Sequence, residues 1–312
     1  MTLALLFSPQ GSQSVGMGRE LAERSPAAAA AFDEADATLG WSVSETCWHG
    51  PTDRLDDTRQ TQPCLLTTSV AAFRALREAA DPVPAVVAGH SVGEYAALVA
   101  AGVLELPAAL RLVARRAELM AGAGEGGMAA VLGLGRDAVQ AVVDGLARPT
   151  ELVVANDNAP GQVVVSGGLD ALERVTDGMR AAGARRVLRL PVSGAFHSPQ
   201  MAGVAEQLAE AFDAETWRDA SVPVMSNVSA EALTDATRIR ALLAEQVRSP
   251  VEWVACVRRM VDDGVHTMVE CGAGAALVGM VRRIAPEVET ATVSDTASLD
   301  AAVELLGQRV TA

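Results

Sequence analysis

The chain has 312 residues, of which 50% are hydrophobic, so it can bury a large core in one domain or in one domain with an insertion. Its formal net charge of −14 argues against a nucleic-acid-binding body, which would need a concentrated basic face. The 4 cysteines show no C-x-x-C spacing and lie in apolar surroundings, which predicts buried thiols in a reducing compartment and no metal site.

The first predicted elements alternate between strands and helices. Residues 2–7 form an apolar run that is too short for a signal peptide and is typical of a buried strand. No later segment is long and apolar enough to span a membrane, so we expect a cytoplasmic protein. A polar, glycine-rich loop at 8–18 leads into a helix, and helical periodicity then covers 27–39 and 63–79, with Pro63 at the first position of the latter helix.

The stretch 89–93 predicts a sharp turn between a short strand and an apolar helix. It reads Gly-His-Ser-Val-Gly, and its two glycines remove the Cβ atoms that would clash in so tight a turn. The hydroxyl of Ser91 would then lie beside a helix N-terminus, where backbone N–H groups can stabilise an oxyanion. The same residues fit an S-x-x-E capping box that ends at Glu94, in which Ser91 would only cap the helix. The pentapeptide alone leaves both interpretations open.

The order of predicted strands and helices changes after a helix at 107–120. A flexible glycine-rich run at 122–127 follows, which we interpret as a domain boundary. The next segment predicts strand, helix, strand, strand, helix and strand, which is the order of a ferredoxin-like unit. We therefore predict a ferredoxin-like subdomain over residues 126–195, inserted into a large α/β-hydrolase-like body made of residues 1–125 and 196–312.

The rest of the chain again alternates between the two kinds of element, which predicts a mainly parallel sheet covered by helices on both faces. The expected strands are 223–227, 266–271 and 288–293. The expected helices are 199–212, 238–247, 250–262, 275–284 and 299–310. Ser298 is a plausible cap for the last helix.

A serine hydroxyl needs a base to take its proton, and the chain has 4 histidines. His49 lies in a Trp-His-Gly-Pro turn, and the side chain of His90 is expected to point away from the neighbouring serine hydroxyl. His266 precedes a buried strand, where a structural histidine is the usual outcome. His197 lies at the junction of the inserted unit and the body, where clefts commonly form, so it is the best candidate for the base.

Short motifs that extend over nearly the whole chain carry a family resemblance. They are Gln10-Gly-Ser-Gln13, Thr61-Gln-Pro63, Gly89-His-Ser-Val-Gly93, Arg116, Asn158-Ala-Pro-Gly-Gln-Val163, Gly194-Ala-Phe-His197, Ser226-Asn-Val228, Ser249-Pro-Val-Glu-Trp253 and Glu270-Cys-Gly-Ala-Gly274. In content and order they resemble the malonyl-CoA:acyl-carrier-protein transacylases and the related acyltransferases of polyketide synthases. The resemblance implies ping-pong transfer of a malonyl group through a serine ester, with no metal or redox cofactor.

The resemblance also implies the catalytic roles. Ser91 would be the acylated nucleophile and His197 its base, oriented by the backbone carbonyl of Ser249. The backbone N–H groups of Gln10 and Val92 would form the oxyanion hole. The family usually has Pro-Gly-Gln-Gly-Ser-Gln, whereas here a proline directly precedes Gln10, which stiffens the loop but leaves the Gln10 N–H available.

The substrate-binding residues follow from the same resemblance. Arg116 would pair with the free carboxylate of malonate, although the residues alone favour a surface arginine at that helix position. Phe196 would wall the space around the malonyl α-carbon, and the Gly-Ala-Phe-His form resembles malonyl-selective members. Gln62, Asn158 and His90 would lie around the substrate.

The expected partners are malonyl-CoA and an acyl carrier protein, either free-standing or part of a polyketide synthase, and the chain is expected to act as a monomer. Carrier proteins are typically acidic, so the basic cluster of Arg180, Arg185, Arg186 and Arg189 could steer one in. Two rival interpretations remain. One is an α/β-hydrolase-type esterase or thioesterase using Ser91 and the late His266, and the other is a non-catalytic docking module for carrier proteins.

Overall fold

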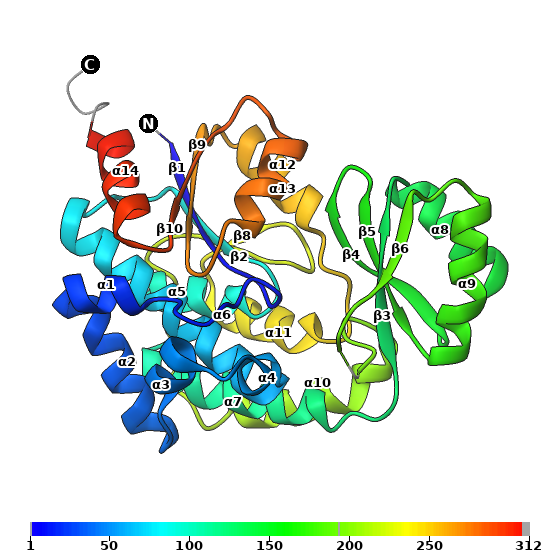
Figure 1. Ribbon diagram of the computed structural model, residues 1–312, viewed down its shortest axis with the longest axis horizontal. Helices are drawn as coiled ribbons and strands as arrows, with labels where there is room; N and C mark the ends of the chain where they lie inside the picture. The colour runs from blue at the N-terminus through cyan, green and yellow to red at the C-terminus, as the bar shows by residue number, and fades with distance from the viewer. Residues whose placement is uncertain (1, 193, 308–312) are drawn as a thin grey trace.

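The computed structural model describes residues 2–192 and 194–307, which form a large α/β body with a smaller unit beside it (Figure 1). The strands of the body are β1 (Leu3–Phe7), β2 (Val86–Gly89), β7 (Val224–Met225), β8 (Ala232–Leu233), β9 (Thr267–Cys271) and β10 (Glu289–Val293). They form one sheet in the order β10-β9-β1-β2-β7-β8, in which only β7 and β8 pair antiparallel. The predicted mainly parallel sheet is confirmed.

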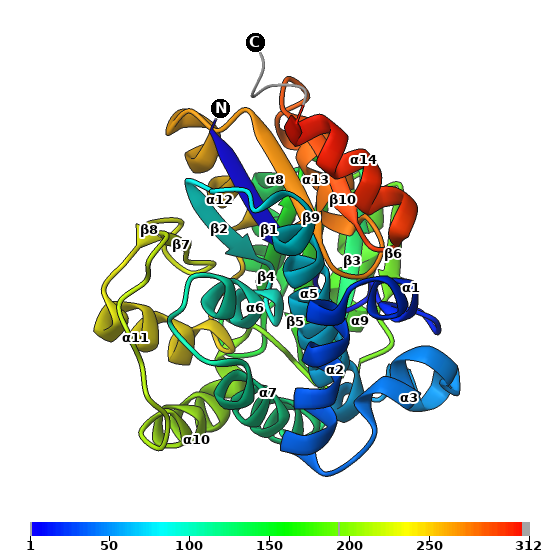
Figure 2. The same ribbon diagram turned by 90° about the vertical axis from the view of Figure 1, so that its left-hand side faces the viewer.

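Helices cover both faces of this sheet. Alternate residues of β1 point to opposite cores, Leu5 into one and Leu6 into the other. The core around Leu6 is closed by α12 (Trp253–Asp262) and α13 (Ala276–Ile284). Longer helices close the core around Leu5, and three of them, α2, α5 and α7, pack side by side (Figure 2). On that side lie α1 (Arg19–Arg24), α2 (Pro26–Leu39), α3 (Val43–His49), α4 (Thr52–Asp56), α5 (Thr58–Ala80), α6 (Gly93–Ala100), α7 (Leu106–Ala121), α10 (Ala202–Phe212), α11 (Ala236–Gln246) and α14 (Thr296–Gly307).

The smaller unit, at the right of Figure 1, is ferredoxin-like as predicted. Its elements are β3 (Gly127–Leu132), α8 (Arg136–Leu146), β4 (Leu152–Ala159), β5 (Gln162–Gly167), α9 (Leu169–Ala181) and β6 (Arg186–Arg189). The sheet order is β4-β5-β3-β6, and every pairing is antiparallel. Residues such as Val131, Val139 and Val175 form a separate core between this sheet and its helices.

Backbone hydrogen bonds join the smaller unit to the body at β4. The Val251 N–H donates to the Ala155 carbonyl at 2.8 Å, and the Asp157 N–H donates to the Val251 carbonyl at 3.0 Å. Next to this bridge, Arg136 of α8 forms an ion pair with Glu252 at the start of α12. These contacts hold the end of β4 against the body, beside the turn that follows β2.

Helix α5 corrects the prediction for Pro63. The helix begins at Thr58, so Pro63 lies inside it and not at its first position. The side chain of Asp57 caps the helix by accepting from the Arg59 N–H at 2.9 Å. Proline in the second turn removes only one intrahelical hydrogen bond, and this capped start tolerates the loss. The residues before it form α3 and α4, which were not predicted.

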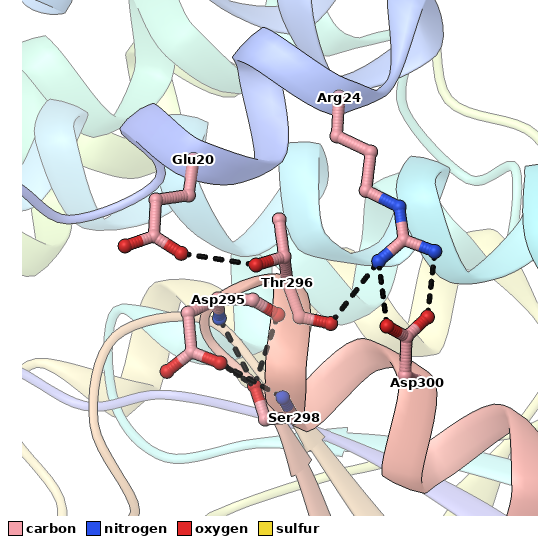
Figure 3. Close-up of polar contacts among 6 residues, drawn as sticks. All are labelled: Glu20, Arg24, Asp295, Thr296, Ser298 and Asp300. Carbon is pink, nitrogen blue, oxygen red and sulfur yellow. Dashed lines mark hydrogen bonds and ion pairs between the residues drawn. The ribbon is translucent and has the colours of Figure 1, made fainter.

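Helix α14 corrects the prediction for Ser298. The helix begins at Thr296, so Ser298 lies within it, and the predicted residues 308–310 fall outside the described chain. The Ser298 N–H donates to Asp295 Oδ1 at 2.8 Å, and the Asp295 N–H donates to Ser298 Oγ at 3.0 Å (Figure 3). Asp295 is therefore the cap, in a reciprocal pair with Ser298. Arg24 of α1 binds Asp300 in the same region and ties α1 to α14.

Candidate active site

The turn from β2 into α6 has the predicted shape of a nucleophile elbow. A Cβ atom on Gly89 would lie 2.0 Å from the Gly93 backbone, and one on Gly93 would lie 2.2 Å from the Phe7 carbonyl oxygen. Ser91 has a φ of 53°, in the left-handed region that non-glycine residues seldom adopt. The capping-box interpretation is wrong, because α6 is capped by Val92 without a side-chain bond and the Ser91 hydroxyl turns elsewhere.

The Ser91 hydroxyl contacts His197. The hydroxyl oxygen lies 2.7 Å from His197 Nε2, and the other ring nitrogen, Nδ1, lies 2.9 Å from the Gln246 carbonyl oxygen. A carbonyl can only accept, so Nδ1 carries the proton and Nε2 is free to accept one from Ser91. The His197 backbone N–H donates to the Val247 carbonyl at 2.9 Å. The last carbonyls of α11, which have no partner within the helix, thus hold the histidine.

The carbonyl that orients His197 corrects the prediction for Ser249. The 2.9 Å bond goes to Gln246, three residues earlier, and the Ser249 backbone contributes only a smaller interaction that raises the pKa of His197. The prediction of Ser249 rested on the family resemblance alone and not on the expected end of a helix. The helix ends at Gln246, and its negative end faces the imidazole.

Burial makes His197 a neutral base. Burial first, and the nearby Arg116 cation second, lower the pKa of His197 to about 3, although the bond to the Gln246 carbonyl acts in the opposite direction. The side chain of His197 is therefore unprotonated at neutral pH, which is the state that a general base requires.

This lowered pKa predicts how stability depends on pH. The unfolded chain has an ordinary histidine pKa of 6.5, so the contribution of His197 to stability is complete above pH 6.5 and is lost as the pH falls toward 3. Between pH 7 and pH 5 we expect the wild type to lose roughly 2 kcal/mol more free energy of unfolding than His197→Gln. Urea unfolding at both pH values measures this, and groups common to both proteins cancel. An equal pH dependence of the two proteins would contradict the assignment.

Arg116 lies beside the same hydroxyl and is 1% exposed, so the alternative of a surface arginine is wrong. Its Nη2 donates to Ser91 Oγ at 3.0 Å and to Gln246 Oε1 at 3.1 Å, and its Nη1 donates to Gln62 Oε1 at 2.6 Å. Among the described residues Nε has no hydrogen-bond partner. A buried guanidinium with a donor to spare beside the nucleophile suits an acyl group that carries a carboxylate.

A cavity of ≈ 130 Å³ opens at Ser91, between the body and the smaller unit. Phe196, which is 4% exposed, lines it, and a Cβ on Gly194 would lie 2.4 Å from the Phe196 ring. Asn158 lines it from β4 and accepts through Oδ1 from His90 Nε2 at 2.8 Å. Burial lowers the pKa of His90 to about 4, so the His90 ring is neutral as well.

The two predicted oxyanion donors are available. Gln10 lines the cavity, and Val92 directly follows the nucleophile. Within the described chain, neither backbone N–H donates to another protein group. Of the predicted substrate-binding residues, Gln62 and Arg116 bind each other and are not among the residues that line the cavity.

Sequence reasoning missed three polar residues that contact the nucleophile or its neighbours. Asn227 and Gln246 bind the backbone of Ser91, and the buried carboxylate of Glu94 binds both of them. Asn227 could have been found, because it is the last residue of the strand predicted at 223–227, at the carboxyl edge of a parallel sheet, and lies in one of the family motifs. Gln246 is the last residue of α11, and no motif or periodicity in the sequence marks it as a site residue.

His266 does not support the hydrolase interpretation. It is exposed and precedes β9, whereas Ser91 follows β2. Both strands run parallel to β1, so the two residues lie at opposite edges of the sheet, separated by a strand length of roughly 15 Å.

Over the described ranges, no group of three His, Cys, Asp or Glu side chains could hold a metal ion, and no helix is long and apolar enough to cross a membrane.

Comparison with known proteins gives one consistent result. Residues 4–301 match the acyl transferase domain family. A malonyl CoA-acyl carrier protein transacylase of Bacillus subtilis is 42% identical over 308 residues, which are 97% of this chain and 97% of the relative. The solved acyl-carrier-protein S-malonyltransferase of Burkholderia pseudomallei superposes with a TM-score of 0.95 at 39% identity, covering 97% of this chain and 100% of that chain. A malonyl-transacylase solved in complex with a type II polyketide-synthase acyl-carrier protein superposes with a TM-score of 0.94 at 38% identity, covering 98% of this chain and 100% of that chain.

Proposed function

The chain belongs to the acyl transferase domain family, and we propose that it moves a malonyl group from malonyl-CoA to the phosphopantetheine thiol of an acyl carrier protein, for fatty-acid or polyketide biosynthesis. The observation that carries the malonyl assignment is the buried Arg116 guanidinium, 3.0 Å from Ser91 Oγ. Malonyl thioesters present a carboxylate that such a group binds, and acetyl thioesters do not.

The first half-reaction acylates Ser91. Its hydroxyl proton passes to His197 Nε2 as the oxygen attacks the thioester carbonyl, and the N–H groups of Gln10 and Val92 receive the oxyanion. His197 then returns the proton to the departing coenzyme A sulfur. Arg116 holds the malonyl carboxylate and Phe196 bounds the space around the α-carbon.

The second half-reaction reverses these roles. The phosphopantetheine thiol gives its proton to His197 and attacks the serine ester, which releases Ser91 and leaves a malonyl thioester on the carrier. All of these groups come from one chain and are side chains or backbone amides, so we propose a monomer that works without a metal or redox cofactor. The direct test is to form the malonyl-enzyme with malonyl-CoA, remove free coenzyme A, add a carrier protein with its phosphopantetheine, and detect the malonyl-carrier by mass.

We also propose that the carrier docks on the small sheet near the cavity. Arg185, Arg186 and Arg189 are exposed and form no ion pair among the described residues, although the chain is strongly acidic. They lie on or just before β6, an edge strand that leads directly to the cavity-lining Leu190. Arg180 differs, because it pairs with Asp177 at 3.1 Å.

Reversing Arg185 and Arg186 to Glu is expected to slow transfer to the carrier at low salt, with normal acylation by malonyl-CoA. The difference should shrink at 1 M salt, where the Debye length falls from ~10 Å at 0.1 M to ~3 Å. Separate assays of the two half-reactions measure this. The control reverses Arg19 and Arg77, exposed residues of α1 and α5, for the same change in charge. Slower acylation alone would assign the arginines to coenzyme A, and no change in either step would discard the docking surface.

A further inference from the structure

Side-chain amides hold both backbone polar groups of Ser91. The Ser91 N–H donates to Asn227 Oδ1 at 2.7 Å, and the Ser91 carbonyl accepts from Gln246 Nε2 at 3.0 Å. Asn227 also donates through Nδ2 to the Gly89 carbonyl at 2.7 Å, so its amide spans the turn. Because Ser91 is held at a φ of 53°, these bonds stabilise a conformation that a serine rarely adopts.

Both amide residues meet at one carboxylate oxygen, Glu94 Oε2. Gln246 Nε2 donates to it at 2.7 Å, and the Asn227 backbone N–H donates to it at 3.2 Å. Glu94 is buried in the first turn of α6, where the helix N-terminus favours an acceptor. Burial raises the pKa of Glu94 to about 7, while Gln246, Asn227 and Arg116 act in the opposite direction.

Glu94 and Arg116 together set the orientation of the Gln246 amide. A guanidinium only donates, so Gln246 Oε1 must face Arg116, and Nε2 then faces the Glu94 oxygen. The remaining N–H of Nε2 reaches the Ser91 carbonyl. The backbone carbonyl of the same glutamine accepts from His197 Nδ1. A shift of Gln246 would therefore move the nucleophile, the base and the guanidinium relative to one another.

We infer that Glu94 is a positioning residue for the acylation step: its carboxylate orients Gln246 and Asn227, and these hold Ser91 Oγ within reach of His197 and Arg116. Glu94 touches no substrate in this role. The inference rests on the proposed serine chemistry.

The test compares Glu94→Leu, which is close in size but has no acceptor, with Glu94→Gln, whose amide oxygen can accept from both donors. We expect Glu94→Leu to slow malonylation of Ser91 by roughly 100-fold, as a misplacement on the order of 1 Å does. Glu94→Gln is expected to stay within about tenfold of the wild type. The readouts are single-turnover malonylation followed by intact mass, and the rate at which phenylmethanesulfonyl fluoride, a neutral reagent, labels Ser91.

Stability is separated from positioning by a matched control. Val139→Ala removes buried volume from the core of the smaller unit without contact to the site, so it should lower the melting temperature and leave both rates unchanged. All rates are measured well below the lowest melting temperature. Wild-type rates in folded Glu94→Leu, or a Glu94→Gln as slow as Glu94→Leu, would overturn the inference.

A further variant keeps the test decisive if Glu94→Leu does not fold. Glu94→Asp retains the carboxylate but withdraws it by one methylene, so it should be slower than Glu94→Gln, and a wild-type rate would again overturn the inference. Failure of the proposed function gives a different result, because the wild type itself would then form no malonyl ester.

Discussion

Ser91→Ala is expected to abolish the covalent malonyl-enzyme that forms when the protein meets malonyl-CoA alone. The first half-reaction needs no carrier protein, so the wild-type ester accumulates and intact-mass analysis detects it. Without the hydroxyl, the site has no oxygen that malonyl-CoA can acylate, and turnover should fall by roughly 10⁴-fold or more. An adduct that persists in this variant would remove the elbow from the mechanism.

The two histidines provide the matched comparison for this result. His197→Ala should slow acylation by roughly 10²- to 10⁴-fold, because no other base lies within hydrogen-bonding distance of the hydroxyl in the described structure. His266→Ala should react like the wild type. If His266→Ala were the inactive variant, the hydrolase interpretation would be correct.

Arg116→Ala is expected to change which acyl group is accepted. A charge-assisted bond in a buried pocket contributes about 1.5–3 kcal/mol, so malonyl-CoA should lose roughly ten- to a hundredfold in kcat/KM relative to acetyl-CoA. Acetyl groups make no use of the guanidinium, so acetyl-CoA activity should change only through the Gln246 amide that Arg116 orients, and far less than malonyl-CoA activity. Parallel assays with the two thioesters measure the ratio.

The control for this variant is Arg115→Ala. Arg115 lies on the same helix, but its side chain is 42% exposed and pairs with Glu118 at 2.8 Å, so its loss should leave the malonyl-to-acetyl ratio unchanged. Removing Arg116 also leaves Gln62 Oε1 and Gln246 Oε1 without this donor, which lowers the free energy of unfolding. That loss affects the assays with both thioesters alike. Equal loss of activity with both thioesters would therefore mean that Arg116 is structural.

Most of the fold was predictable because its signals are local. The alternation of strand and helix patterns depends on the spacing of apolar residues, and the turn at Ser91 depends on contacts between Gly89 and Gly93, four residues apart. The errors were also local. Pro63 and Ser298 were taken as helix starts, but the side chains of Asp57 and Asp295 start those helices earlier.

The site was less predictable because its partners are distant in the chain. Ser91 and His197 are 106 residues apart, and Arg116 and Gln246 are 130 apart. The position of His197 at the junction of the two units already made it the best candidate base for Ser91. Only the family resemblance placed Arg116 at the site, since the residues alone favoured a surface arginine. Arg116 is buried because its donors bind the side-chain oxygens of Gln62 and Gln246, which lie far from it in the chain. A single sequence does not show such contacts.

Local sequence is sufficient for the α/β class, the ferredoxin-like unit and the elbow, since each depends on periodicity or on near neighbours. Tertiary packing alone decided which groups hold Ser91 and His197. The packing of α11 places its C-terminal end at the imidazole, where the last carbonyls have no partner within the helix. There the Gln246 carbonyl accepts from His197 Nδ1, and the Gln246 side chain meets Glu94, Arg116 and Ser91.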